Sequence, residues 1–332
     1  MGKKCRRTYY RIIPIIIFFL IALKTAAQDS IMPVHLVTVG MDNDFLNIAD
    51  KGTDEYYTAG IYLQYGFASN SPKNILRKIL PLPSSKSSSF FSIGLTQWMF
   101  TPSDLKTTNY AKDDYPYCGS LFLGLSRENI VKQKNLFRSE IWLGIMGKSA
   151  LGEQTQMLVH KIMGFEKPEG WNEQLPDYPL INYNLYYERS LLPANDIVKV
   201  NGFAYLQTGS LLNTLSAGID FMITNKKENN FPDRYYITTG NENMHDLKFF
   251  IQLKPTIRVV ASNAMLEGGF FQEKNYYHIQ ASDLNRIIGL LEGNMGIHAR
   301  RFSLICKQVL ETPQFKMVHG HVYGSIILSM NM

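Results

Sequence analysis

The sequence predicts an all-β fold, a transmembrane antiparallel β-barrel of about 12 strands with a short helix in an external loop. Three observations lead to this prediction. Apolar and polar residues alternate over many runs of about ten residues. The chain is rich in aromatic residues, with 19 Tyr and 19 Phe. Beyond its N-terminal segment it contains no apolar run long enough for a membrane helix. A closed barrel would satisfy every backbone polar group in lipid.

The N-terminal segment, residues 1–27, is typical of a secretory signal peptide. Basic residues precede the mostly apolar run 12–23, and Thr25, Ala26 and Ala27 provide small residues for cleavage. This run is shorter than the roughly 20 residues that a spanning helix needs, although a signal anchor is the alternative interpretation. The segment has six basic residues and no acidic ones, so residues 28–332, the expected barrel domain, have no net charge, against +6 for the whole chain. No nucleic-acid partner is therefore expected.

The strands follow from alternation along the remaining chain. In 136–146, for example, Ile141 and Leu143 lie on one face, and Arg138 and Glu140 lie on the other. A soluble sandwich would also alternate, but this mixture of charged and aromatic residues on the polar face favours a hydrated or hydrogen-bonded barrel interior. We see no linker and no repeat that would divide the chain. The predicted strands are 34–43, 56–67, 89–101, 117–126, 134–147, 179–191, 197–209, 212–224, 246–261, 285–297, 298–311 and 321–331.

The connections predict where the two ends of the barrel lie. If the first strand runs outward, the segments 44–55, 102–116 and 148–178 all belong to the outer rim. The long segment 225–245 would then be periplasmic, which is unusual and would also fit a missed strand. Within 148–178, residues 153–165 lack alternation and consist of good helix formers. Gln156 and His160 are four residues apart, so they share one face of this helix.

The end of the first strand is rich in oxygen ligands. Asn43 and Asp44 are followed by Asp50, Asp54 and Thr58. Such groups suit a hard cation such as calcium, although a capped turn is the simpler alternative. The alternation places Thr58 on the non-lipid face of its strand.

His160 is the candidate base. An imidazole can take a proton from water, and a nearby cation can polarise an ester carbonyl, so the combination predicts an ester hydrolase without a covalent nucleophile. The sequence contains no GxSxG motif. A Ser/His pair is the alternative, but no spacing supports it. Outside the N-terminal segment the chain has two cysteines, Cys118 and Cys306, which allow a single disulfide.

Five short motifs occur in order over residues 36–190. They are Asn43-Asp44, Tyr57-Thr58-Ala59-Gly60, Thr101-Pro102-Ser103, the run from Asp114 to Gly119, and the run from Gly152 through Gln156 to His160. In this order and spacing they resemble the outer-membrane lipid A 3′-O-deacylase family.

The resemblance implies a twelve-stranded barrel in the bacterial outer membrane that binds Ca²⁺ and hydrolyses the 3′-linked acyloxyacyl ester of lipid A. Lipid A or lipopolysaccharide would be its substrate, outer-membrane lipids would surround it, and we expect a monomer. The general base would match His160, with Gln156 and Thr58 also in the site and the cation near Asp44 and Asn43. The catalytic lysine of the family has its nearest counterpart in Lys106, one position away. The alternatives are a calcium-dependent outer-membrane phospholipase and a non-enzymatic pore or structural barrel.

Overall fold

The computed structural model describes most of the chain after residue 34. The described ranges are 35–48, 56–69, 71, 74–83, 89–106, 114–131, 135–192, 197–225, 247–272, 276–299, 301–316 and 318–332. The predicted signal peptide 1–27, the candidate ligands Asp50 and Asp54, and nearly all of the segment 225–245 lie outside these ranges.

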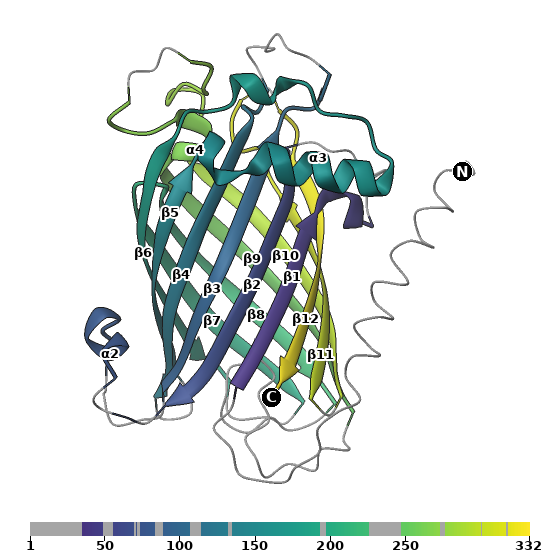
Figure 1. Ribbon diagram of the computed structural model, residues 1–332. Coiled ribbons are helices and arrows are strands. Elements are labelled where there is room, and N and C mark those ends of the chain that lie inside the picture. Colours follow the sequence, from purple (N-terminus) through teal and green to yellow (C-terminus); the bar gives the residue numbers. More distant parts are fainter. Residues whose placement is uncertain are drawn as a thin grey trace.

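The described residues form twelve antiparallel strands that close into a barrel (Figure 1). Each strand pairs with its neighbours in the sequence, and β1 pairs with β12 to close the sheet. The fold prediction is confirmed; β4 is longer than expected and β11 is shorter. The strands are β1 His35–Asn43, β2 Tyr56–Ser69, β3 Ser89–Thr101, β4 Cys118–Val131, β5 Asn135–Met146, β6 Tyr178–Ser190, β7 Val198–Gly209, β8 Leu212–Thr224, β9 Lys248–Asn263, β10 Ile287–Ala299, β11 Phe302–Glu311 and β12 His321–Asn331.

The outer surface of the barrel is apolar. On β9, Ile251 and Ile257 are 61% and 62% exposed, whereas the alternate residues Lys254 and Arg258 are half-buried and face inward. This is the pattern of a barrel with a lipid-facing exterior. Pro255 lies on the outward face, and the β8–β9 ladder is interrupted beside it because proline has no N–H to donate. No described helix is long and apolar enough to cross a bilayer.

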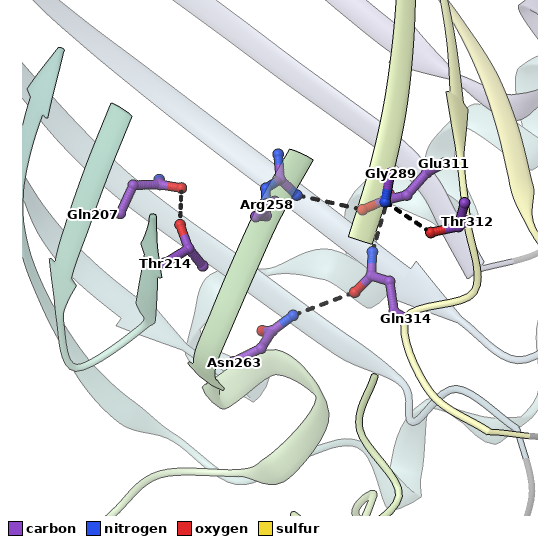
Figure 2. A network of polar contacts seen from close by, with 8 residues as sticks. All are labelled: Gln207, Thr214, Arg258, Asn263, Gly289, Glu311, Thr312 and Gln314. Carbon is purple, nitrogen blue, oxygen red and sulfur yellow. Dashed lines mark hydrogen bonds and ion pairs between the residues drawn. The ribbon is translucent and has the colours of Figure 1, made fainter. Parts of the chain in front are cut away.

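The lumen holds a hydrogen-bonded network. Arg258 Nη1 donates to Glu311 Oε1 at 3.3 Å, and Gln314 connects Glu311 to Asn263 (Figure 2). A cavity of about 320 Å³ borders this network. Above it, a cluster of buried aromatic and aliphatic side chains fills the outer end, to which the short helix α4 (Ala264–Glu267) contributes. A cluster of apolar side chains at this position would obstruct a water-filled channel through the barrel.

Loops that follow odd-numbered strands meet at one end of the barrel, as predicted. Tyr277 donates a hydrogen bond to the Asp114 carbonyl at 2.5 Å, and Gln272 donates one to the Asp177 carbonyl at 2.7 Å. This outer end carries the 3-10 turns η1 (Asp44–Leu46), η2 (Lys148–Ala150) and η3 (Gly170–Glu173), and the helix α3 (Gly152–Met163). The helix expected at 153–165 is therefore present. The short helix α2 (Leu76–Ile79) lies towards the opposite end (Figure 1).

The two cysteines do not form the disulfide that the sequence allowed. Cys118 is buried in this apolar cluster, and Cys306 is exposed on the outer face of β11. Both are free thiols.

Candidate active site

Helix α3 lies against the outer face of the barrel wall, over β3 and β4 (Figure 1). Gln97 shows which face this is. It shares the outward alternation of Ile93 and Leu95, which are 41% and 50% exposed, and its Nε2 donates to the Ala150 carbonyl just before α3 at 2.6 Å. The site that α3 covers is therefore on the lipid side of the wall and outside the lumen.

The face that α3 buries is polar. Gln156 and His160 are 2% and 4% exposed, whereas Leu158 and Ile162 are 58% and 49% exposed. This reverses the arrangement of a surface helix in a soluble protein, where the apolar stripe faces the core. The exposed Leu158 and Ile162 suit contact with lipid. The buried Gln156 and His160 need hydrogen-bond partners, from the protein or from a ligand.

Close approach between α3 and the wall depends on two glycines. A Cβ on Gly119 of β4 would lie 3.3 Å from the Gly152 backbone, and a Cβ on Gly152 would lie 2.7 Å from the ring of Trp171. A side chain at Gly152 would therefore collide with the tryptophan, and one at Gly119 would press on the helix backbone, so both glycines favour the close approach.

Thr58 faces the outer side of the wall because β2 contains a bulge. The β2–β3 register shifts between Tyr57 and Ala59, so Thr58 is an extra residue in its strand. Its Oγ1 lies 2.5 Å from Oγ1 of Thr101, which shares the outward alternation of Met99. The prediction that Thr58 lies on the non-lipid face is therefore wrong, because one inserted residue reverses the alternation beyond it.

The turn after β1 places Asn43 and Asp44 next to Thr58. Asn43 Nδ2 donates to the Thr58 carbonyl at 2.9 Å, and its Oδ1 accepts from the Phe45 N–H at 2.8 Å. Asn43 thus caps η1 and ties it to β2. Asp44 is 1% exposed, and its Oδ1 also accepts from the Phe45 N–H.

Residues from β11 and β12 hold this turn against the outer wall. Gln308 donates to the Leu46 carbonyl at 3.0 Å and accepts from the Ile48 N–H at 3.1 Å. A Cβ on Gly324 would lie 2.2 Å from the Leu46 carbonyl oxygen, so η1 can cross β12 only at a glycine.

An aromatic contact joins the two halves of the site. Phe45, next to Asp44, lies 5.7 Å from Phe165, and Phe165 packs edge-on against the His160 ring at 5.6 Å, both measured between ring centroids. This contact places the turn that carries Asn43 and Asp44 beside the end of α3 that carries His160, although about a hundred residues separate them in sequence.

The orientation of His160 is fixed by a backbone carbonyl. His160 Nδ1 is hydrogen bonded to the Glu166 carbonyl oxygen, which can only accept, so Nδ1 carries the proton. In the neutral ring the lone pair is then on Nε2. This is the tautomer that a base needs in order to take a proton through Nε2.

Lys106 lies at the edge of this arrangement. Its Nζ pairs with Glu166 Oε2 at 2.9 Å, and the two side chains are 62% and 73% exposed. The Glu166 carboxylate accepts a hydrogen bond from Lys106 and attracts its charge, which raises the pKa of the lysine. Lys106 thus contacts the residue whose carbonyl orients His160.

Backbone strain is found beside both halves of the site. Among the described residues, Tyr56 and Leu151 are the two non-glycine residues with positive φ, at 68° and 61°. Tyr56 precedes the Thr58 bulge, and Leu151 precedes α3. Such conformations cost about 1–3 kcal/mol each and persist where the surroundings impose them, often at functional sites. Here the Tyr56 ring stacks on Tyr115 at 4.5 Å.

Of the two oxygen donors expected to hold a hard cation, Asp44 fits this role and Asn43 fits it less well. Asp44 supplies a buried carboxylate, and carbonyl oxygens and water commonly complete a calcium shell. Asn43 fits less well as a ligand, because both ends of its amide already hold the turn. Among the described residues no group of three or more His, Cys, Asp or Glu side chains could hold a metal.

Sequence reasoning missed several residues that build the site. Trp171 donates its indole N–H to Gln156 Oε1 at 2.7 Å, and it packs in a small cluster with Ala59, Met99 and Tyr117. The sequence signal that could have identified Trp171 is a large aromatic residue within an otherwise polar loop. Gln308 and Gly324 gave no signal, since their role depends on the turn crossing β12.

Comparisons with known proteins agree with this structure. The family model described as "Outer membrane protein LpxR" matches residues 13–332. No curated protein matches the chain.

Among solved structures, LpxR from Salmonella typhimurium is similar, with a TM-score of 0.70, 19% sequence identity, and coverage of 89% of this chain and 99% of that one. At this identity the likeness shows the fold alone. The NanC porin covers 90% of this chain and 100% of its own at 6% identity, but its TM-score of 0.39 supports no argument.

Proposed function

The chain belongs to the outer membrane LpxR family, the lipid A 3′-O-deacylases, and we propose that it removes the 3′-linked acyloxyacyl chain of lipid A at the site between α3 and the barrel wall. It is accordingly an ester hydrolase and an outer-membrane β-barrel protein. The observation that carries the proposal is the buried polar face of α3, on which Gln156 and His160 lie against the lipid-facing side of the wall.

The position of the site suits a substrate that lies in the membrane. Leu158 and Ile162 point away from the wall on the exposed face of α3. Outer-leaflet acyl chains would contact these side chains while a substrate ester reaches the polar face beneath. Lipid A would therefore enter sideways from its own leaflet. We further propose that the barrel acts as a monomer and that residues 1–27 direct its export.

The chemistry proposed for His160 is general-base catalysis. Nε2 takes a proton from water as the water oxygen bonds to the ester carbonyl carbon, and charge develops on the carbonyl oxygen. When the intermediate collapses, the bond to the sugar oxygen breaks, and the imidazolium gives its proton to that oxygen. The products are the sugar alcohol and a fatty acid. The Glu166 carbonyl keeps Nδ1 protonated throughout and stabilises the charged ring.

We propose Asp44 as the anchor of a calcium ion. Bound calcium would polarise the ester carbonyl. Asn43 and Gln308 fix the backbone of the turn that carries Asp44, so the carboxylate keeps one position. Thr58, held by Thr101, closes the wall side of the site. Lys106 lies at the exposed edge, where its charge would face the anionic groups of the substrate.

Mass spectrometry of lipid A tests this function. The protein is expressed in a host whose lipid A keeps its 3′ chain, and lipid A and phospholipids are analysed together. We expect loss of the 3′ acyloxyacyl group in membranes with calcium and little loss with a chelator. His160→Ala should lower the rate about 10²- to 10⁴-fold, the range for loss of a general base, with normal heat-modifiable migration.

The same experiment separates the alternatives. Cleaved phospholipids with intact lipid A would identify a phospholipase. Unchanged lipids together with single-channel conductance would identify a pore. Full activity in His160→Ala would contradict the mechanism, and full activity with the chelator would contradict the calcium proposal alone.

A further inference from the structure

The side-chain amide of Gln156 makes a hydrogen bond through its oxygen and none through its nitrogen among the described residues. Trp171 Nε1 donates to its Oε1 at 2.7 Å, whereas its Nε2 has no hydrogen-bond partner among the described residues, although Gln156 is 2% exposed. An indole N–H can only donate, so the amide oxygen must face Trp171 and the NH₂ group must point elsewhere. A buried donor without a partner loses its hydrogen bonds to water and gains none in return, which destabilises the folded protein. Such an expense at this position indicates a group kept for a ligand.

The unused donor belongs to the same face as the base. Gln156 lies one helical turn before His160, and both are buried between α3 and the wall. A substrate ester that reaches His160 would therefore lie alongside the Gln156 amide. Its carbonyl oxygen is the acceptor that an amide NH₂ group would bind.

Trp171 is held firmly enough to orient this amide. It is 1% exposed, and its ring packs on Tyr117 at 5.0 Å between centroids. The backbone around it is tied to the wall and to the neighbouring loop, since Leu175 donates to the Tyr117 carbonyl at 2.9 Å and Glu169 donates to the Leu105 carbonyl at 2.8 Å. On the other side, the ring lies against Gly152, where a side chain would collide with it.

We propose that Gln156 Nε2 donates a hydrogen bond to the ester carbonyl oxygen of the substrate, and that Trp171 is a positioning residue that fixes the amide in this donating orientation. The inference rests on the ester hydrolase function proposed above. A fixed donor aimed at this oxygen stabilises the transition state more than the ground state, because negative charge develops there as water adds. Without the indole N–H, the amide is free to turn and present its oxygen, which repels the carbonyl oxygen.

Trp171→Phe tests the positioning role, since it removes the N–H and keeps most of the ring. With lipid A in detergent micelles and calcium, we expect kcat to fall about 10- to 100-fold, a part of the 10²- to 10³-fold cost of losing such a donor. KM should change less than about twofold, and the pH profile should keep its shape, because His160 is untouched. Tyr117→Phe is the matched control. It removes a hydroxyl from the same cluster, 3.2 Å from the Leu105 carbonyl, and should leave kcat within about twofold.

A double-mutant cycle separates orientation from packing. Gln156→Met should lower kcat about 10²- to 10³-fold, and adding Trp171→Phe to it should cost less than about threefold more. Equal losses from Trp171→Phe in both backgrounds, or an equal loss in Tyr117→Phe, would mean that the tryptophan only packs, and would overturn the inference.

Two further readouts keep the test decisive. If Trp171→Phe does not give a heat-modifiable barrel, Gln156→Glu takes its place. At a pH where the glutamate is ionised it keeps an acceptor for Trp171 and lacks the NH₂ donor, so it should lose as much activity as Gln156→Met. An active wild-type protein with undiminished Gln156→Glu or Trp171→Phe variants would overturn this inference alone. A wild-type protein that releases no fatty acid would instead contradict the proposed function.

Discussion

The inner and outer faces of the wall, where β1 ends and β2 begins, differ in what their polar residues contact. On the inner face Tyr57 donates to Asp42 Oδ2 at 2.9 Å, and Lys307 Nζ lies 3.8 Å from Asp42 Oδ1. On the outer face, one residue further along each strand, Asn43 Nδ2 donates to the Thr58 carbonyl at 2.9 Å. On the same face the buried Gln156 has an amide nitrogen with no hydrogen-bond partner among the described residues.

The contrast separates polar groups that support the barrel from those available to a substrate. On the inner face Asp42, Tyr57 and Lys307 pair with one another across strands, which stabilises the lumen. On the outer face Asn43 contacts backbone atoms and Thr58 lies in a bulge, while the Gln156 donor has no partner in the part of the chain that the structure describes. Residues adjacent in sequence, such as Asp42 and Asn43, therefore differ in purpose because they point to opposite sides.

We expect the largest loss of activity when α3 is displaced from the outer face of the wall. In Gly152→Ala the new Cβ would lie 2.7 Å from the Trp171 ring, so the helix or the tryptophan must shift. We expect deacylation to fall about 10- to 100-fold, because a misplacement near 1 Å can cost this much. The barrel itself should still form, as judged by heat-modifiable migration.

The control for this variant is Gly293→Ala in β10. A Cβ there would meet no atom within 4 Å, so activity should be unchanged. Wild-type activity in Gly152→Ala would show that the close contact between α3 and the wall is not required.

Replacing Lys106 should change activity only slightly, because this residue lies at the exposed edge of the site and not in its buried part. Exposed ion pairs are screened by water and salt and contribute little, so Lys106→Ala should lower activity no more than about fivefold, and less at high salt. The pKa of Lys106 is raised by Glu166, so its charge is present at neutral pH and is lost only as the pH rises above the usual range for lysine.

Rates of deacylation measured from about pH 6 to 9 check this expectation. The ratio of wild-type to Lys106→Ala activity should stay constant across that range. A loss as large as that of His160→Ala would instead place Lys106 in the chemical step.

Much of this arrangement is visible in the sequence. Alternation predicts the twelve strands, the loss of alternation at 153–165 predicts α3, and spaced motifs predict which distant residues meet. The side of the wall on which Thr58 lies could not be predicted, because a single bulged residue reverses the alternation and leaves no mark in composition. Trp171 was missed for a different reason. Its role comes from a loop folding back over α3, and loops have no periodicity from which to infer contacts.

A matched pair of threonine substitutions tests the central claim, that the site is on the outer face of the wall. Thr58 and Thr214 are both buried, and each hydroxyl makes a side-chain hydrogen bond, at 2.5 Å to Thr101 outside and at 2.9 Å to Gln207 in the lumen (Figure 2). Replacement by valine keeps the shape and removes one hydrogen bond in either case.

Deacylation of lipid A by the two purified variants is the measurement. We predict that Thr58→Val lowers kcat about tenfold or more, the equivalent of about 1.4 kcal/mol, and that Thr214→Val stays within about twofold of the wild type. Equal losses in the two variants, or a larger loss in Thr214→Val, would contradict a site on the outer face.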